Sequence, residues 1–499
     1  MKTGWLSARP FRYVAPLPMK TTLLLLLVPS WLVAQGLRID DARYADLPQK
    51  RSSEGIGKLP ARIDLSMFAP EVINQGDNGI CVAVSVGYYM RTILEAQKRQ
   101  VTSRLGMGQV NKLRFSPWYL YNTIKEAGDT DCKAGIDIGA ALEYIKQKGL
   151  PAYSAAATQT CEPPTPLEAT PDSRLLDYVK LFGIVDDRKL KELATKKALS
   201  ELSPVVVGIQ TTPSLKSLTL RKTIVPRISS ALAGQRATDR SAFTLWRPEL
   251  SSSLSFGHAM CVVGYDDTMF GTGAFKLINS WGTNWGDNGY FWIAYADFGQ
   301  YAKYGYQAYV QTAGSPTDII LSADIAISTA TFFTGTDQPV ERIKNGTTLA
   351  AYRVIKPQRT GTPFKFSARL SKQTYLYLVT ANSTDEVATK LFPEQGYSPL
   401  IGRDTRVELP NGTLLRLEGA PGLEYWLFLF SETAIDIDDY IAKINAQKGP
   451  FSNRVQTAFG DALAPYQQIS YKDKKMGFFL KSQHRGRIVP LLVSMNHVK

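Results

Sequence analysis

Helical and strand-like periodicities occupy different halves of the segment from residue 59 to residue 313, and this order limits the fold class. Apolar residues recur at helical spacing in the first half, over residues 80–98, 116–127, 138–149 and 189–201. Strand-like runs follow in the second half, at residues 204–210, 258–265 and 273–279. Helices that precede strands, and do not alternate with them, favour an α+β domain with a helical lobe and a sheet lobe.

The texture of the sequence changes after residue 313. Short alternating runs such as FKFSARL and YWLFLFS are separated by turn signals such as PEQG and PNGT. We predict a β-rich accessory domain over residues 314–445, followed by a helical and basic extension of that domain over residues 446–499. The accessory domain contains no cluster of titratable residues typical of a catalytic site. We therefore expect it to have a binding or spacing role, with an unknown partner. Residues 211–255 have no clear period and are predicted to be a long surface excursion.

Residues 1–34 have the pattern of a secretory signal peptide. Lys20 precedes an apolar run from Leu23 to Val33, and the small residue Ala34 suits a cleavage site. Eleven residues are too few to cross a bilayer, so we expect no integral membrane span in the mature chain. Met1 and Met19 both fit as the start. We expect an exported protein in the periplasm, at the cell surface or outside the cell, with a short flexible leader over residues 35–58.

The chain carries a surplus of positive charge. Its formal net charge is +14 over 499 residues, and the loss of four basic residues with the signal peptide lowers it to about +10. The preferred explanation of this surplus is solubility, and the alternative is contact with an acidic surface or an anionic glycan. Lys and Arg are scattered without a nucleic-acid-binding motif, so no nucleic acid is expected as a partner.

Cys81 lies where a thiol can act as a nucleophile. It follows a glycine-bearing turn and begins the predicted helix over residues 80–98. The partial positive charge at a helix N-terminus is expected to lower the pKa of the thiol. Cys261 is the rival nucleophile, but it lies in the middle of an apolar strand, which predicts a buried core cysteine.

A thiol nucleophile also needs a proton partner, and the chain has only three histidines. His484 and His497 lie in the basic C-terminal tail, whereas His258 begins an apolar strand. Asn279 closes a neighbouring strand 21 residues later, where its side chain can accept the other ring N–H of His258. We therefore predict that Cys81, His258 and Asn279 meet.

Three segments carry a resemblance to a known family. QGDNGIC, GHAMCVVGYDD and NSWGTNWGDNGYFWI resemble the signature segments of the papain-like cysteine peptidases, in the family's order of Gln, Cys, His and Asn. The resemblance covers roughly residues 59–310, and the small residue after the cysteine is similar to a secreted bacterial branch. It implies a two-lobe papain-like fold and hydrolysis of polypeptides without a metal or an organic cofactor.

The resemblance also implies individual roles. Cys81 would be the nucleophile, and His258 the general base and acid. Asn279 would orient His258, with Trp281 covering their hydrogen bond. Gln75 would donate its side-chain amide to the oxyanion hole together with the backbone N–H of Cys81.

Two further segments follow the family with departures. Gly135 matches the glycine beside which a substrate backbone pairs as an added strand, while Ala134 replaces a glycine and is expected to reshape the cleft. The family's cysteine three residues before the nucleophile is Asn78 here. Cys132 therefore lacks its usual partner, and Cys161 becomes the candidate for a disulfide with it. The leader is too short to resemble a long inhibitory pro-segment, although a short blocking peptide is the alternative.

Two other functions keep the same residues. An acyl transferase would use the site of Cys81, His258 and Asn279 to pass the acyl group to an amine, and a catalytically retired papain-fold protein would only bind. The four intact catalytic positions argue against retirement. The accessory domain resembles, in TYLYLVTANSTDEVATKLFPEQG, a module of unknown function that follows bacterial catalytic domains.

Overall fold

The structure is a computed structural model that divides into two compact units, Met1–Val33 and Ala34–Lys499. Only parts of the second unit are described, so the predicted signal peptide lies outside the described residues. The described residues are 36–51, 59–156, 159–218, 244–249, 256–311, 319–331, 334–343, 349, 351–384, 386–403, 405–410, 413–481 and 488–499.

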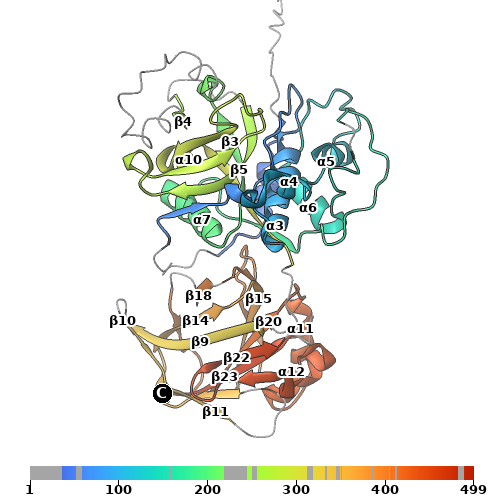
Figure 1. Cartoon of the computed structure of the whole chain (residues 1–499). Coiled ribbons are helices and arrows are strands. Elements are labelled where there is room, and N and C mark those ends of the chain that lie inside the picture. Colours follow the sequence, from blue (N-terminus) through green and yellow to red (C-terminus); the bar gives the residue numbers. More distant parts are fainter. Residues whose placement is uncertain are drawn as a thin grey trace, which may run out of the picture. The chain divides into compact units, whose positions relative to one another are not determined.

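One buried helical segment forms the centre of the helical lobe (Figure 1). It runs through α2 (Cys81–Ala83), a π-helical stretch (Val84–Met90) and α3 (Arg91–Lys98), and its side chains from Cys81 to Ala96 are buried. Three further helices complete the lobe, namely α4 (Met107–Asn111), α5 (Pro117–Ile124) and α6 (Ile138–Lys148). The side chain of Asp137 caps the start of α6, and Gly149, with a φ of 75°, ends it as a glycine stop.

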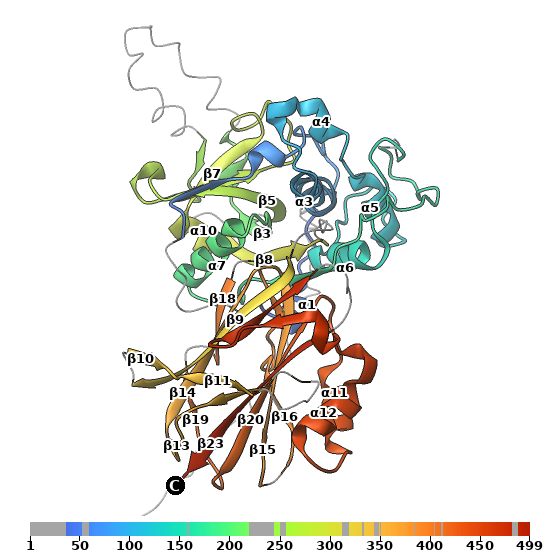
Figure 2. The same ribbon diagram turned by 60° about the horizontal axis from the view of Figure 1, so that its bottom comes forward.

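An antiparallel sheet forms the second lobe, in the order β2-β8-β3-β5-β6-β7-β4, with β1 beside β5. The strands are β1 (Arg62–Asp64), β2 (Asp177–Lys180), β3 (Val205–Thr211), β4 (Leu245–Trp246), β5 (Phe256–Asp266), β6 (Ala274–Ile278), β7 (Tyr290–Ala294) and β8 (Ala302–Tyr309). β4 pairs with β7 in parallel, whereas the other strand pairs are antiparallel. Helices α7 (Arg188–Ser200) and α10 (Tyr295–Tyr301) pack on this sheet (Figure 2). The α+β fold with a helical lobe and a sheet lobe is thus confirmed.

The C-terminal region, from β9 to the end of the chain, contains two further sheets. The first has the order β18-β14-β9-β22-β21 and the second the order β11-β12-β23-β20-β15-β16, with shorter strands attached to each. Their strands are β9 (Ile319–Thr331), β10 (Thr334–Asp337), β11 (Val340–Ile343), β12 (Ala351–Val354), β13 (Gln358–Arg359), β14 (Pro363–Leu370), β15 (Thr374–Asn382), β16 (Thr389–Phe392), β17 (Leu400–Ile401), β18 (Thr405–Leu409), β19 (Leu415–Arg416), β20 (Gly422–Ser431), β21 (Ile469–Tyr471), β22 (Met476–Lys481) and β23 (Val489–Val498).

The two sheets of the C-terminal region share one apolar core. Phe366 of β14 and Phe478 of β22 meet Phe428 and Trp426 of β20 in the same buried cluster, as in a sandwich of two sheets. The opposite face of β15 and β20 packs against α11 (Ile437–Asn445) and α12 (Phe451–Phe459), which lie side by side in Figure 2.

Three expectations about local structure were wrong. Within residues 446–499, α12 is followed by strands β21 to β23, because Met476, Phe478 and Leu480 are buried at the two-residue period of a strand. The predicted surface excursion over 211–255 includes β4, where Trp246 is fully buried. The same segment also contains the short helical turn Pro213–Leu215, and its residues 219–243 and 250–255 lie outside the described residues.

The predicted flexible leader is instead packed over its described part, residues 36–51, which we call the leader below. It contains the short helix α1 (Asp41–Asp46), and Tyr44 is buried. The Tyr44 hydroxyl donates to the carbonyl of Phe182 at 2.6 Å, and the Tyr44 ring lies 4.6 Å from that of Tyr304. A buried aromatic side chain with a satisfied hydroxyl fixes a segment that its polar composition alone would leave mobile.

Candidate active site

The side chains of His258 and Asn279 are in direct contact. His258 lies near the start of β5 and Asn279 directly follows β6, and their side chains join through His258 Nε2 and Asn279 Oδ1 at 2.8 Å. The same Oδ1 accepts the backbone N–H of Ser280 at 2.8 Å, which orients the amide with its oxygen toward His258. Nε2 is therefore the protonated nitrogen of a neutral His258, and Nδ1 is its basic nitrogen.

Trp281 covers this pair. Its ring stacks on the imidazole of His258 with a centroid distance of 4.9 Å and an interplanar angle of 23°. Trp285 packs edge-on against Trp281 at 5.1 Å and is itself buried. Two indole rings on one side of a hydrogen bond keep water away from it, and a lower local dielectric strengthens the bond.

Cys81 begins the central helical segment beside the strand of His258. Ser85, one turn further along, donates its hydroxyl to the carbonyl of Ala259 at 2.9 Å, and Ala259 is the residue after His258. The backbone N–H of Ala259 also interacts with the Cys81 thiol. The helix head and the start of β5 are thus joined where the sequence predicted that thiol and imidazole meet.

The electrostatics of Cys81 differ from the expectation. Burial raises the pKa of its thiol to about 12, although hydrogen bonding from the backbone of Ala259 partly offsets this. Desolvation of the thiolate therefore outweighs the lowering of the pKa that we expected from the helix N-terminus.

The raised pKa predicts a distinctive alkylation profile in the full chain. With a pKa of about 12, only about one Cys81 in 10⁵ is ionised at pH 7. Because only the thiolate reacts, alkylation of Cys81 by iodoacetamide should accelerate about tenfold per pH unit from pH 7 to pH 10. Peptide mapping by mass spectrometry measures this rate, with the urea-unfolded protein as reference. A rate that levels off near pH 7 would contradict the prediction.

Gln75 is held rigidly beside the turn that leads into Cys81. Its side-chain Nε2 donates to the carbonyl of Asn78 at 2.7 Å, and its Oε1 accepts the hydroxyl of Ser280. Its backbone N–H donates to the carbonyl of Ser280 at 2.8 Å. Ser280 thus positions both Gln75 and Asn279, a role that the sequence analysis missed although Ser280 directly follows Asn279.

Gly135 lies at a close approach of two backbones. Its φ is 75°, and its N–H donates to the hydroxyl of Tyr121 at 3.0 Å. A Cβ atom at this position would come within 2.4 Å of the carbonyl oxygen of Gly36 in the leader. The neighbouring Ala134 donates its N–H to Asp129 Oδ1 at 3.3 Å. The backbone beside Gly135 is therefore paired, and its partner is the leader.

The leader runs as an added strand past this glycine. Ile136 N–H donates to the carbonyl of Gly36, and Arg38 N–H donates to the carbonyl of Ile136, each at 3.1 Å, so that Leu37 pairs in parallel with Ile136. A Cβ atom on Gly36 would lie 2.1 Å from the carbonyl oxygen of Gly79, two residues before Cys81. The leader thus passes close to the turn that carries the thiol.

The side chain of Leu37 lies on the other side of the site. Cβ atoms on Gly208 and Gly257 would come within 2.9 and 3.2 Å of Leu37 Cδ2. Gly257 directly precedes His258, and Gly208 lies on the neighbouring strand β3, opposite Ala259. Two glycines therefore leave a hollow for a branched aliphatic side chain at the start of β5, and Leu37 fills it.

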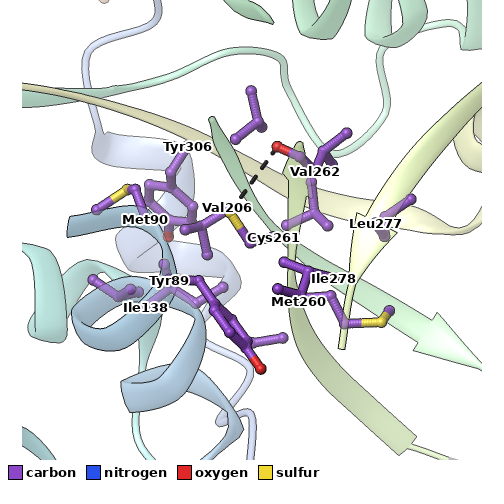
Figure 3. Close-up of a cluster of buried hydrophobic side chains, with 14 of the residues drawn as sticks. Tyr89, Met90, Ile138, Val206, Met260, Cys261, Val262, Leu277, Ile278 and Tyr306 are labelled. Atoms are coloured by element: carbon purple, nitrogen blue, oxygen red, sulfur yellow. Dashed lines mark hydrogen bonds between the residues drawn. The ribbon is translucent and has the colours of Figure 1, made fainter. Parts of the chain in front are cut away.

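The remaining cysteines and histidines have structural surroundings. Cys132 and Cys161 form a disulfide. Cys261 is fully buried among Tyr89, Met90, Val206 and Ile278 in the core (Figure 3). His497 lies on β23 of the C-terminal region, where Nδ1 meets Glu424 Oε1 at 2.9 Å and Nε2 meets the Thr360 hydroxyl at 2.9 Å. His484 lies outside the described residues.

The described part of the chain contains neither a cluster of metal-binding side chains nor a helix suited to span a membrane. Within it, no group of three or more His, Cys, Asp or Glu side chains is arranged to hold a metal ion. Within the same ranges, no helix combines the length and the apolar character needed to cross a membrane.

Sequence comparisons point to one family. The family model described as "Papain family cysteine protease" matches residues 244–310, the segment that contains His258 and Asn279. A cathepsin L-like proteinase of Fasciola hepatica is 27% identical over 248 residues, which are 47% of this chain and 60% of that protein. Vignain of Vigna mungo is 26% identical over 242 residues, which are 48% of this chain and 55% of that protein. The chain thus spans less than two thirds of these relatives.

Among solved structures, xylellain, a cysteine protease from Xylella fastidiosa, matches with a TM-score of 0.39 and 20% identity. That match covers 56% of this chain and 96% of the xylellain chain. The family model covers the segments of His258 and Asn279, whereas those of Gln75 and Cys81 lie outside its match. Residues 244–310 thus match the papain family of cysteine proteases, and about half of the chain is similar to a cathepsin L-like proteinase and to vignain.

Proposed function

We propose that the protein is a secreted thiol peptidase that hydrolyses peptide bonds through an acyl-enzyme on Cys81. The observation that carries this proposal is the hydrogen bond between His258 Nε2 and Asn279 Oδ1, next to the strand position that contacts the Cys81 thiol. The hydrogen bond fixes the tautomer of His258, so Nδ1 is the nitrogen available to accept a proton.

The reaction uses these groups in two stages. His258 Nδ1 takes the proton of Cys81 as the thiolate attacks the substrate carbonyl, and the oxyanion is stabilised by the backbone N–H of Cys81 and by the amide of Gln75. His258 then gives the proton to the leaving amine. A water molecule, deprotonated by His258, attacks the thioester and regenerates the Cys81 thiol.

The leader blocks this reaction while it occupies the cleft. Its backbone already uses the pairing groups of Ile136, and Leu37 fills the hollow over Gly208 and Gly257. A substrate would replace it, with its backbone beside Gly135 and Ile136 and a branched aliphatic side chain in the hollow. The protonated, buried thiol belongs to this covered state.

Export of the protein is part of the proposal. Its support is the charged and apolar pattern of residues 1–34 and the disulfide between Cys132 and Cys161, which suits an oxidising compartment. The positive net charge also supports weak contact with acidic surfaces or anionic glycans outside the cell.

Hydrolysis of an unstructured polypeptide by Asn279→Ala tests the role of the His258–Asn279 pair. We expect kcat to fall about 10- to 100-fold with little change in KM, because orientation of the imidazole contributes to the transition state and Asn279 does not touch the substrate. Initial rates and the new amino termini of the products are measured. Acyl transfer would instead give amide products with the added amine.

Asn453→Ala, at an exposed position of α12, serves as the matched control and should retain full activity. An Asn279→Ala protein with unchanged kcat would exclude this role for Asn279. If the protein yields no cleaved product even after the Gly36→Val substitution has displaced the leader from the cleft, the binding-protein alternative is favoured.

A further inference from the structure

The end of the leader lies between two different sheets. On one side, Lys50 N–H donates to the carbonyl of Lys180 in β2 at 2.7 Å. On the other side, Gln49 N–H donates to the carbonyl of Gly396 at 2.8 Å, and Ser398 N–H donates to the carbonyl of Gln49 at 3.0 Å. Gly396 and Ser398 belong to the loop between β16 and β17 of the C-terminal region. The backbone of residues 48–50 therefore bridges the two regions, with Pro48 and Lys50 bonded to the peptidase sheet and Gln49 bonded to this loop.

Arg51 fits a pocket made by the same loop. Its side chain is 3% exposed, and its guanidinium lies 5.2 Å from the centre of the Phe392 ring and 5.3 Å from that of Tyr397. Glu394 pairs with the guanidinium. A buried arginine is tolerated only where aromatic faces and a carboxylate replace its water. The last residue of β16, Phe392, and the loop after it supply these groups, and Arg51 fills the pocket.

Lys50 is enclosed with the help of the C-terminal region as well. Its Nζ pairs with Glu201 and donates to Gln307 Oε1 at 2.7 Å. The hydroxyl of Thr405 donates to Glu201 Oε1 at 3.0 Å, and a Cβ atom on Gly402 would come within 2.4 Å of Glu201 Oε2. The C-terminal region therefore closes the cavity in which the Lys50–Glu201 pair is buried.

We infer that the C-terminal region has a function of its own, which is to bind the end of the leader and thereby retain residues 36–38 in the cleft. Its binding surface consists of Phe392, Glu394, Gly396, Tyr397, Ser398 and Thr405. The partner of this surface is the leader segment from Gln49 to Arg51. The consequence for peptidase activity rests on the proposed function, whereas the retention itself does not.

Retention at one end acts on the other because the leader is short. The contacts that hold residues 36–51 include those beside Ile136, around Tyr44 and at Gln49–Arg51. The free energy for opening such a segment includes all of these contacts. Loss of the Arg51 pocket therefore raises the open population of the whole leader and exposes Cys81 more often.

Glu394→Ala in the full chain tests this inference. Glu394 is partly exposed, and its loss leaves the Arg51 guanidinium buried without its carboxylate. We expect deuterium exchange at the amides of Arg38 and Lys50, and alkylation of Cys81 by iodoacetamide, to accelerate about tenfold or more. Arg51→Ala should have a similar effect, and combining the two changes should add little, because both remove the same pair.

Glu341→Ala is the matched control. Glu341 also pairs with an arginine, Arg353, but both side chains of this pair are about half exposed, so its loss should change neither rate. Unchanged exchange and alkylation in both Glu394→Ala and Arg51→Ala would overturn the inference. If both rates rise but no peptide is hydrolysed, the retention stands and the proposed peptidase function fails.

Discussion

Cys81→Ala is expected to abolish peptide hydrolysis, lowering kcat by about 10⁴-fold or more. The substitution removes the sulfur on which the acyl-enzyme forms, and no neighbouring group replaces it. Removal of a triad nucleophile also makes the other members ineffective, because His258 then has no thiol proton to accept. Initial rates on an unstructured polypeptide measure the effect, after circular dichroism has shown that the variant is folded.

The second free cysteine provides the control. Cys261→Ala removes a fully buried thiol from the core, so it should cost some stability but leave kcat within about twofold. If Cys261→Ala abolished hydrolysis and Cys81→Ala did not, the nucleophile would be misassigned.

Gly36→Val is expected to activate the protein. A valine Cβ would lie 2.1 Å from the carbonyl oxygen of Gly79, and the φ of 90° at residue 36 is strained for a β-branched side chain. The leader must then leave the cleft. We expect hydrolysis and iodoacetamide labelling of Cys81 at pH 7 to increase about 100-fold, because the thiol becomes hydrated and its pKa falls.

Gly106→Val is the control that distinguishes the steric clash at residue 36 from the strain of a valine at positive φ. Gly106 has a φ of 101°, but a Cβ atom there would meet no atom within 4 Å. This variant should show neither faster labelling nor faster hydrolysis. Equal rates for Gly36→Val and the parent protein, measured side by side, would contradict the blocking role of the leader.

Sequence periodicity was sufficient to predict the main helices and strands of the two lobes. The predicted helix over residues 80–98 contains the segment from Cys81 to Lys98, and the predicted strands over residues 204–210 and 258–265 correspond to β3 and β5. Helical and strand periods are local properties, so one sequence reports them directly. The contact between His258 and Asn279 could also be predicted from the sequence, because the chain has few histidines and the two residues lie on adjacent strands.

The leader was not predictable in the same way. Its polar composition indicates flexibility, yet Tyr44 is fixed by the carbonyl of Phe182, 138 residues away in the sequence. The raised pKa of Cys81 has a similar origin, because burial depends on the whole fold and the helix N-terminus is only a local feature. Long-range contacts decided both cases, and no local pattern encodes them.

The hydrogen bond between Ser85 and Ala259 limits how the two lobes move. It joins the helix of Cys81 to the strand of His258 at a fully buried position, and separating the lobes would leave the Ala259 carbonyl without a partner. A hinge that widens the cleft is therefore unfavourable. Under the proposed function, we therefore expect the cleft to change little in width when a polypeptide binds, so that selection among substrates depends mainly on their fit to this shape.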